Sequence, residues 1–374
     1  MKTVRLGDYI EEHCEKNKKG DDIPVFSVTN TNGFCTEYFS KDVSSKDKSN
    51  YKIVYKGFFA YNPSRINVGS VDWLRNEKKV IVSPLYNVFS VSPELDKQYL
   101  YYFLKSERGK TLITSKAEGS VRDNLKFSIL SDFPIPLPSI EEQRKFVAKL
   151  DKSNELILKY KRLLEYYDTL IKSRFIEMFG DPVLNEKGWE LKTLPELGEF
   201  GRGVSKHRPR NAPELLGGKY PLIQTGDVAN ANLYITDYES TYSEKGFKQS
   251  KMWKAGTLCI TIAATIAKTA ILTFDSCFPD SVVGFTPNEN TNSLFINYWF
   301  SFFQKILEEQ APAVAQKNIN LQVLSELKII SPPIELQNDF AAFVQQIDKS
   351  KFAVQKSLEK TETLYKSLMQ EYFG

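Results

Sequence analysis

The chain has 374 residues, which is enough for two domains of ordinary size, each with its own core. Hydrophobic residues make up 41% and charged residues 26%, a globular composition that excludes a disordered or fibrous chain. The net charge of +4 is mild, so any nucleic-acid-binding surface must come from local clusters of basic residues.

Membrane insertion, secretion and metal binding find little support in the sequence. The longest apolar run, at 258–267, has ten residues and is rich in Thr, which is too short to span a bilayer. The N-terminal stretch lacks the hydrophobic core of a signal peptide, so we expect a cytoplasmic protein. The four cysteines form no CxxC pair and there are only two histidines, so we expect free thiols and no metal site.

Residues 1–138 have the mixed pattern of an α/β domain. Short β-rich runs stand at 23–28, 52–55 and 79–83, and a helical pattern covers 96–113. We expect these residues to form the first domain.

A long helix is predicted for residues 139–180. Ser139 followed by Glu142 is a capping-box pattern, in which each side chain satisfies a backbone N–H at the helix start. Gly180 and Pro182 supply the stop signal, and residues 140–179 contain neither Gly nor Pro. Forty helical residues make a rod of about 60 Å.

The same order of segments then occurs a second time. After a linker at 181–188, residues 189–333 show strand patterns at 220–225, 257–263 and 269–274 and a helical pattern at 292–309. A second long helix is predicted for 334–374. Gln337 follows Gln143 by 194 residues, within PSIEEQRKFV and PPIELQNDFA, and Gly374 follows Gly180 by the same interval. A repeat of this length indicates two copies of one structural unit.

Apolar residues recur along both long helices in steps of four and three, the spacing of a coiled-coil seam. We expect the helices to pack on each other in antiparallel fashion, related by a pseudo-twofold axis, as a scaffold that sets a distance. The predicted seam residues are Phe146, Leu150, Ile157, Leu164, Ile171, Phe340, Val344, Ile347, Leu358 and Leu368. The predicted fold class is therefore α+β, with two mixed α/β domains separated by two long helices.

Basic and amide side chains gather in predicted loops of both domains. Lys and Arg bind phosphate, whereas Asn, Gln and Arg are the side chains that pair with base edges. Each residue alone is more often an ordinary turn or solvated residue. The candidates in the first domain are Lys16, Lys18, Lys19, Asn62, Arg65, Asn67, Arg122 and Asn124. The candidates in the second domain are Arg202, Lys206, Arg208, Arg210, Gln224, Thr265, Lys268, Gln316, Lys317 and Asn318.

The order of these segments resembles the DNA-specificity subunit of type I restriction-modification systems. The resemblance covers the whole chain and is carried by AQKNINLQVLSELKIISPPIELQ at 315–337, FIEMFGDP at 175–182 and TIAKTAIL at 265–272. It implies that each domain recognises one half of a bipartite, asymmetric DNA sequence, and that the helices fix the unread spacer between the halves. It also implies two methyltransferase subunits that use S-adenosylmethionine, motor-nuclease subunits as further partners, and no catalytic residue or cofactor in this chain. The second copy departs from the first where PIELQ replaces SIEEQ, so the start of the second helix is less well capped.

Two other functions remain as alternatives. One is an interaction scaffold, with two domains on a coiled coil and a protein ligand. The other is a methyltransferase, which needs a [DNS]-P-P-[YFW] loop; SPPI at 331–334 lacks the aromatic and SPLY at 83–86 lacks the second proline. The glycines of EFGRGV at 199–204 also lack the spacing and βαβ setting of a cofactor loop.

Overall fold

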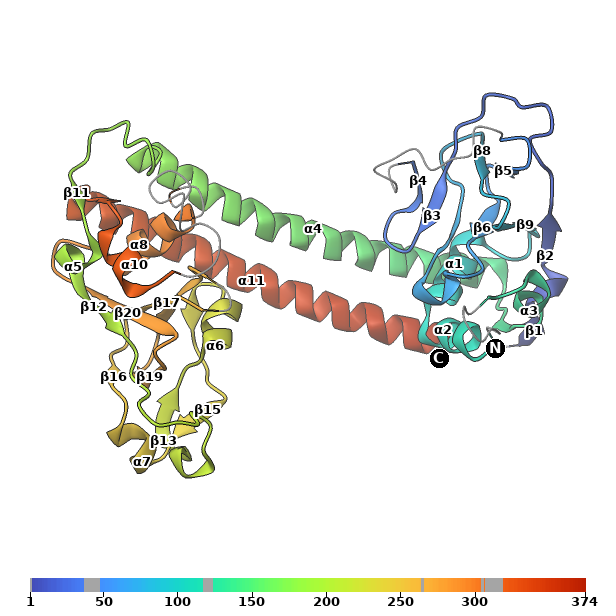
Figure 1. Ribbon diagram of the computed structural model, residues 1–374. Coiled ribbons are helices and arrows are strands. Elements are labelled where there is room, and N and C mark those ends of the chain that lie inside the picture. The colour runs from blue at the N-terminus through green and yellow to red at the C-terminus, as the bar shows by residue number, and fades with distance from the viewer. Residues whose placement is uncertain (1, 37–47, 117–123, 264–265, 304–305, 307–318) are drawn as a thin grey trace. The chain divides into compact units, whose positions relative to one another are not determined.

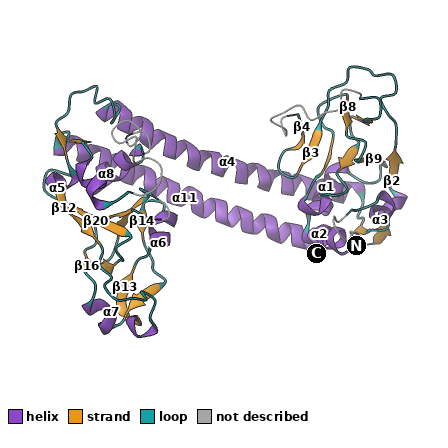
Figure 2. Cartoon of the chain, in the orientation of Figure 1, coloured by secondary structure: helices purple, strands orange, loops and turns teal. Residues whose placement is uncertain are grey.

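The computed structural model describes residues 2–36, 48–116, 124–263, 266–303, 306 and 319–374. The chain divides into two compact units, one formed by 1–161 with 355–374 and the other by 162–354. Each unit contains one α/β domain and one part of each long helix, α4 (Ile140–Phe179) and α11 (Ile334–Phe373), as Figures 1 and 2 show.

The first domain is built on antiparallel strands with helices packed beside them. A four-stranded sheet has the order β2-β9-β6-β7, and β3-β4 and β5-β8 form separate pairs. The first strand, β1, pairs with the last, β10, so the domain begins and ends at one place, next to the start of α4. The strands are β1 (Thr3–Arg5), β2 (Ile10–His13), β3 (Ser27–Thr29), β4 (Gly33–Cys35), β5 (Lys52–Tyr55), β6 (Phe59–Tyr61), β7 (Val71–Trp73), β8 (Lys79–Val82), β9 (Asn87–Val91) and β10 (Pro134–Pro136). The helices are α1 (Lys97–Lys105), α2 (Glu107–Lys116) and α3 (Phe127–Ser131).

Two predicted elements of this domain are corrected. The single helix expected over 96–113 breaks at Ser106, whose hydroxyl donates to the Phe103 carbonyl (2.7 Å) and accepts from Gly109 N–H (3.1 Å). Gly109 lies so close to α1 that a Cβ there would stand 2.1 Å from the Phe103 oxygen. The strand expected over 23–28 begins only at Ser27, and the residues before it form a single parallel bridge, from Val25 to Ile81 of β8, rather than a ladder.

The second domain has one five-stranded and one four-stranded sheet. Their strand orders are β12-β20-β17-β18-β14 and β15-β13-β19-β16. As in the first domain, the first strand, β11, pairs with the last, β21. The strands are β11 (Leu191–Lys192), β12 (Gly198–Arg202), β13 (Leu216–Leu222), β14 (Tyr234–Ile235), β15 (Ser240–Tyr242), β16 (Met252–Trp253), β17 (Leu258–Thr261), β18 (Thr269–Leu272), β19 (Ser276–Cys277), β20 (Val282–Pro287) and β21 (Ile329–Ile330). The helices are α5 (Leu194–Leu197), α6 (Thr225–Asn230), α7 (Glu244–Lys248), α8 (Ser293–Phe300) and α10 (Leu321–Glu326).

The strands predicted at 257–263 and 269–274 are present as the shorter β17 and β18. The strand predicted at 220–225 is wrong at its end, because Asp227 accepts from the backbone N–H of Gln224 (2.7 Å) and helix α6 starts at Thr225. The helix predicted at 292–309 ends at Phe300 as α8, and residues 304–305 and 307–309 of that prediction lie outside the described residues.

The long helices begin and end as the sequence predicts. The Glu142 carboxylate accepts from Ser139 N–H (3.0 Å), Glu142 N–H donates to the Ser139 hydroxyl (3.3 Å), and Gly180 has a φ of 77° after the last turn of α4. In the first unit Phe146 of α4 stacks on Tyr372 of α11, with ring centroids 3.9 Å apart. In the second unit Phe175 contacts Phe340 (5.5 Å between centroids). Early residues of one helix thus meet late residues of the other, which confirms the antiparallel coiled coil and the predicted fold class.

The predicted seam lies against the partner helix or the domains. Among its residues Leu150, Ile157, Ile171, Phe340, Val344 and Leu358 are buried and Phe146, Leu164, Ile347 and Leu368 are half-buried. Ion pairs flank the seam, namely Lys161 with Glu362 (3.0 Å) in the first unit and Lys351 with Asp168 (2.6 Å) in the second.

The repeated glutamine has the same role in both units. Gln143 is buried; its amide nitrogen donates to the carbonyls of Glu94 (2.9 Å) and Pro138 (3.0 Å), and its oxygen accepts from Asp96 N–H (2.8 Å). Asp96 is the N-cap of α1. The glutamine therefore fastens the first turn of the long helix to the start of the domain helix.

Gln337 makes the equivalent three hydrogen bonds in the second unit. It is buried, donates to the carbonyls of Asn290 (3.2 Å) and Pro332 (2.8 Å), and accepts from the N–H of Asn292 (3.0 Å), the N-cap of α8. The repeat in the sequence is thus a repeat of one junction between domain and spacer helix.

Candidate nucleic-acid interface

The loop after β6 brings two of the predicted base-reading residues together. Asn62 and Arg65 line a polar recess of 60 Å³ with the β3–β4 hairpin residues Thr29 and Asn30. The loop folds back on itself, since Arg65 N–H donates to the Asn62 carbonyl (3.0 Å) and Ser70 N–H to the Arg65 carbonyl (3.1 Å). This places one amide and one guanidinium on a compact surface turn, a chemistry suited to hydrogen bonding with base edges.

Two of the amide side chains form hydrogen bonds within the turn itself. The side-chain oxygen of Asn62 accepts from Ser64 N–H (3.1 Å), and that of Asn67 accepts from Val68 N–H (2.9 Å). Asn124 is exposed beside the same loop, because the next residue, Leu125, donates its N–H to the Pro63 carbonyl (3.1 Å). Asn62 and Asn67 therefore have a local structural role, whatever they contact in a complex.

The predicted lysines of the first domain lie elsewhere. Lys16, Lys18 and Lys19 are exposed, and the backbone of Lys16 bridges to Lys52 of β5 rather than to the β6 loop. They do not line the recess. Arg122 lies outside the described residues, as do Thr265, Gln316, Lys317 and Asn318 of the second domain.

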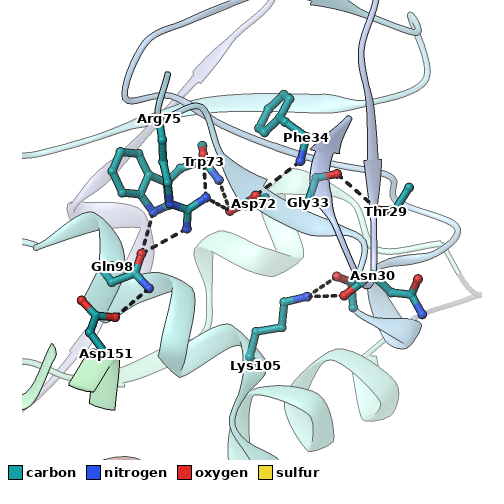
Figure 3. Close-up of polar contacts among 11 residues, drawn as sticks. Thr29, Asn30, Gly33, Phe34, Asp72, Trp73, Arg75, Gln98, Lys105 and Asp151 are labelled. Carbon is teal, nitrogen blue, oxygen red and sulfur yellow. Dashed lines mark hydrogen bonds and ion pairs between the residues drawn. The ribbon is translucent and has the colours of Figure 1, made fainter. Parts of the chain in front are cut away.

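Lys105, which no sequence pattern singles out, contacts both turns that line the recess (Figure 3). Lys105, at the end of α1, donates to the Gly69 carbonyl of the β6 loop (2.5 Å) and to the Asn30 carbonyl of the β3–β4 turn (3.4 Å). Burial lowers the pKa of Lys105, an effect that the nearby Asp72 opposes. One cation thus fixes the two turns relative to each other.

A chain of polar contacts continues from the hairpin to the long helix α4 (Figure 3). The buried carboxylate of Asp72 accepts from Phe34 N–H (3.4 Å) and from Arg75 (2.6 Å). Arg75 donates to the Gln98 oxygen (3.1 Å), and Gln98 donates to Asp151 of α4 (3.5 Å). The β3–β4 hairpin of the first domain is therefore connected to the same helix that carries the seam.

The basic loop of the second domain, residues 202–210, is positioned by close packing at its base. Gly203 donates its N–H to the Val282 carbonyl (2.9 Å), and a Cβ on it would lie 2.2 Å from the Phe278 oxygen. Gly203 is therefore buried against protein backbone, which leaves no room beside it for a phosphate. Gly201 is less confined, since its Cβ would meet only Trp253 at 3.8 Å.

The charged side chains of the basic loop are exposed, and two of them pair with one acid. Arg202, Lys206, Arg208 and Arg210 are all exposed. Arg208 pairs with Asp280 (3.3 Å), and Arg210 donates to the other oxygen of the same carboxylate. The sequence does not point to Asp280, which lies 70 residues beyond Arg210 and belongs to no motif.

Arg210 and Gln224, predicted separately, line one recess of 250 Å³ together with Thr225 and Ser281. Thr225 and Ser281 hydrogen-bond through their hydroxyls (3.1 Å), and Gln224 donates to the Ser240 hydroxyl (3.3 Å). Lys268 is exposed in the β17–β18 turn and does not line this recess. The recess combines donors and acceptors suited to base edges with a local positive charge.

Within the described ranges, no group of three His, Cys, Asp or Glu side chains is placed to hold a metal ion. The four cysteines Cys14, Cys35, Cys259 and Cys277 are free thiols. No helix in the described part of the chain has the length and apolarity needed to cross a membrane.

Comparisons with known proteins agree with this geometry. The family model of the type I restriction modification DNA specificity domain matches residues 2–165 and again 186–362. The putative type I restriction enzyme MjaX specificity subunit of Methanocaldococcus jannaschii is 22% identical over 349 residues, covering 88% of this chain and 80% of that protein. The putative type I specificity subunit S.MpnORF638P of Mycoplasma pneumoniae is 39% identical over 136 residues, covering 34% of this chain and 32% of that protein.

Solved structures share the fold. The type I restriction-modification S subunit from M. genitalium aligns with a TM-score of 0.61 at 16% identity, covering 100% of this chain and 96% of that chain. A chain from a structure of complex assembly in the type I R-M system aligns with a TM-score of 0.58 at 18% identity, covering 100% of this chain and 97% of that one.

Proposed function

Because this chain belongs to the family of type I restriction-modification DNA specificity subunits, with two DNA sequence recognition domains, we propose that it reads a bipartite and asymmetric DNA site. Each domain reads one half. The observation that carries this proposal is the contrast between a repeated framework and unlike loops. The Gln143 and Gln337 junctions are equivalent, whereas the first domain presents Asn62 and Arg65 and the second presents Arg210 and Gln224.

The two long helices act as the spacer of this reader. A helix of 40 residues with a continuous seam resists bending, so it fixes the number of unread base pairs between the halves. The junction glutamines hold each domain in place on its spacer helix, because they connect the first turn of the long helix to the start of the domain's own helix.

The partners proposed for this chain are two methyltransferase subunits, with motor-nuclease subunits completing a restriction complex. The long helices expose large apolar side chains that suit a protein interface, among them Tyr166 (59% exposed) and Phe352 (72%) in the second unit. Catalysis and the cofactor S-adenosylmethionine are assigned to the methyltransferase subunits, which extrude an adenine from the duplex. This chain is then a non-catalytic recognition subunit. Its free thiols suit the reducing cytoplasm, where we place it.

The experiment is to co-express the chain with its methyltransferase partner and map adenine methylation across the genome. We expect methylation at one two-part sequence with a fixed gap. Exchanging residues 189–333 for another recognition domain is expected to change one half of that sequence only. Methylation without a two-part motif, or a change in both halves, contradicts the proposal. Loss of both sequence preference and steep salt dependence of DNA binding would favour the protein-scaffold alternative.

A further inference from the structure

The two arginines of the basic loop share one carboxylate but use their guanidinium groups differently. Arg208 donates to the carbonyls of Ser205 (2.5 Å) and His207 (2.9 Å) as well as pairing with Asp280 (3.3 Å). Its donors therefore stabilise the loop that carries it. This arginine is a structural element of the loop.

Arg210 lines the recess instead, and its hydrogen bond goes to Asp280 rather than to a carbonyl of the loop. Its side chain is 43% exposed and lines the 250 Å³ recess, and one of its terminal nitrogens donates to Asp280. A guanidinium has five N–H donors in a planar fork, so an acid that holds one edge leaves other donors of the same plane directed outward. This contact with Asp280 restricts the orientation of the Arg210 fork.

The acid also distinguishes a base edge from a phosphate as the ligand. Asp280 offsets part of the charge of the two arginines that it contacts and repels a phosphate, so Arg210 is a weaker phosphate ligand than an arginine without an acid beside it. Guanine instead presents two neutral acceptors, O6 and N7, on its major-groove edge, and an arginine fork matches them both. Adenine places an N–H₂ donor where guanine has O6, which opposes the same fork.

We propose that Arg210, oriented by Asp280, is a specificity-determining residue that reads a guanine in the DNA half-site of the second domain. The inference rests on the proposed function and adds a base identity to it. Arg210 makes the base contact, and Asp280 is a positioning residue that acts through Arg210. The recess beside them, with Thr225 and Ser281, provides the room for the base edge.

The test uses the full chain with its methyltransferase partner and genome-wide methylation maps of the wild type, Arg210→Lys, Arg210→Gln, Asp280→Asn and Lys206→Gln. Exchange of 189–333 assigns the half-site of the second domain. In Arg210→Lys, we expect one guanine position of that half-site to lose discrimination by about 10- to 100-fold, since lysine keeps the charge but not the fork. Asp280→Asn is expected to relax the same position less strongly. Lys206→Gln, which removes an exposed charge from the same loop, is expected to lower methylation evenly with an unchanged motif.

The possible outcomes separate this inference from the function on which it rests. A wild-type map without a two-part motif contradicts the proposed function itself. A two-part motif whose second half requires no G·C pair, or whose bases are all still required in Arg210→Lys, overturns the assignment of Arg210. If Arg210→Gln lowers methylation uniformly at all sites and Arg210→Lys restores it fully, Arg210 is a phosphate contact. That result also overturns its assignment as a base contact. Thermal unfolding of each purified complex confirms that the variants are folded.

Discussion

The junction glutamines allow a prediction that can be checked at single backbone amides. Replacing Gln143 by Met keeps most of the side-chain volume but removes one acceptor and two donated hydrogen bonds. The amide N–H of Asp96 and the carbonyls of Glu94 and Pro138 then lose their partner. The same substitution at Gln337 affects the equivalent groups of the second unit.

The magnitude follows from these contacts. A buried polar group that loses its partner destabilises the fold by about 1–3 kcal/mol, so three such groups predict a loss of about 3–5 kcal/mol after partial relaxation. The effect is expected to be local to the unit that carries the substitution, because each glutamine contacts only its own domain. Gln355→Met is the matched control, since Gln355 is exposed on α11 and donates only to Glu359 on the next turn (3.1 Å).

Hydrogen exchange followed by mass spectrometry measures the effect directly. In Gln143→Met the Asp96 amide is expected to exchange about 10- to 100-fold faster, with the Asn292 amide unchanged, and Gln337→Met is expected to give the reverse pattern. Gln355→Met is expected to change neither amide. If both junction variants resemble Gln355→Met in exchange and in urea unfolding, the glutamines do not fasten the domains and the reasoning is refuted.

Three further predictions concern the first domain and the spacer. Gly33→Ala is expected to destabilise the chain more than Gly20→Ala in urea unfolding. Both glycines have left-handed φ values (58° and 69°), but only at Gly33 would an added Cβ clash, at 1.9 Å from the Asp72 carboxylate. Equal losses of unfolding free energy in the two variants would contradict this prediction. Burial lowers the pKa of Lys105 from its ordinary 10.5, so the folded state releases this proton at lower pH than the unfolded state. The unfolding free energy of the wild type relative to Lys105→Met is therefore expected to rise as the pH increases toward 10.5. A difference that does not change with pH would contradict this prediction. Inserting about four residues, one turn of about 6 Å, in both α4 and α11 is expected to change the spacer in the methylation map and leave both half-sequences as they were, whereas altered half-sequences with the old spacer would exclude the ruler.

The sequence predicts the long helices well because their determinants are local. Ser139 and Glu142 lie within one turn of each other, Gly180 ends the helix by its own backbone conformation, and the seam repeats at a fixed interval. Short strands were predicted less accurately, since a strand end depends on a partner elsewhere in the chain. Helix α6 replaces the end of a predicted strand because the Asp227 side chain forms a cap with Gln224, a competition that apolar periodicity does not register.

The residues of the candidate site also fall into those that the sequence predicts and those that depend on distant contacts. Residue type alone suggested Asn62, Arg65, Arg210 and Gln224, and the fold does bring each pair into one recess. It could not suggest Asp280 or Lys105, because an acid and a lysine acquire a role here only through contacts across 70 and 75 residues of chain.

The junctions and the loops of the two copies differ in how readily a single substitution alters them. The junction needs one glutamine and three backbone groups, so a single substitution breaks it, and both copies retain it. Under the proposed function, a reading loop instead needs a base-contacting side chain and a support from elsewhere in its domain. The two copies have different supports: a lysine from α1 in one and an aspartate before β20 in the other. On that proposal, a change of target sequence is expected to require coordinated changes within one domain and none at the junction, so that recognition domains can be exchanged as whole units.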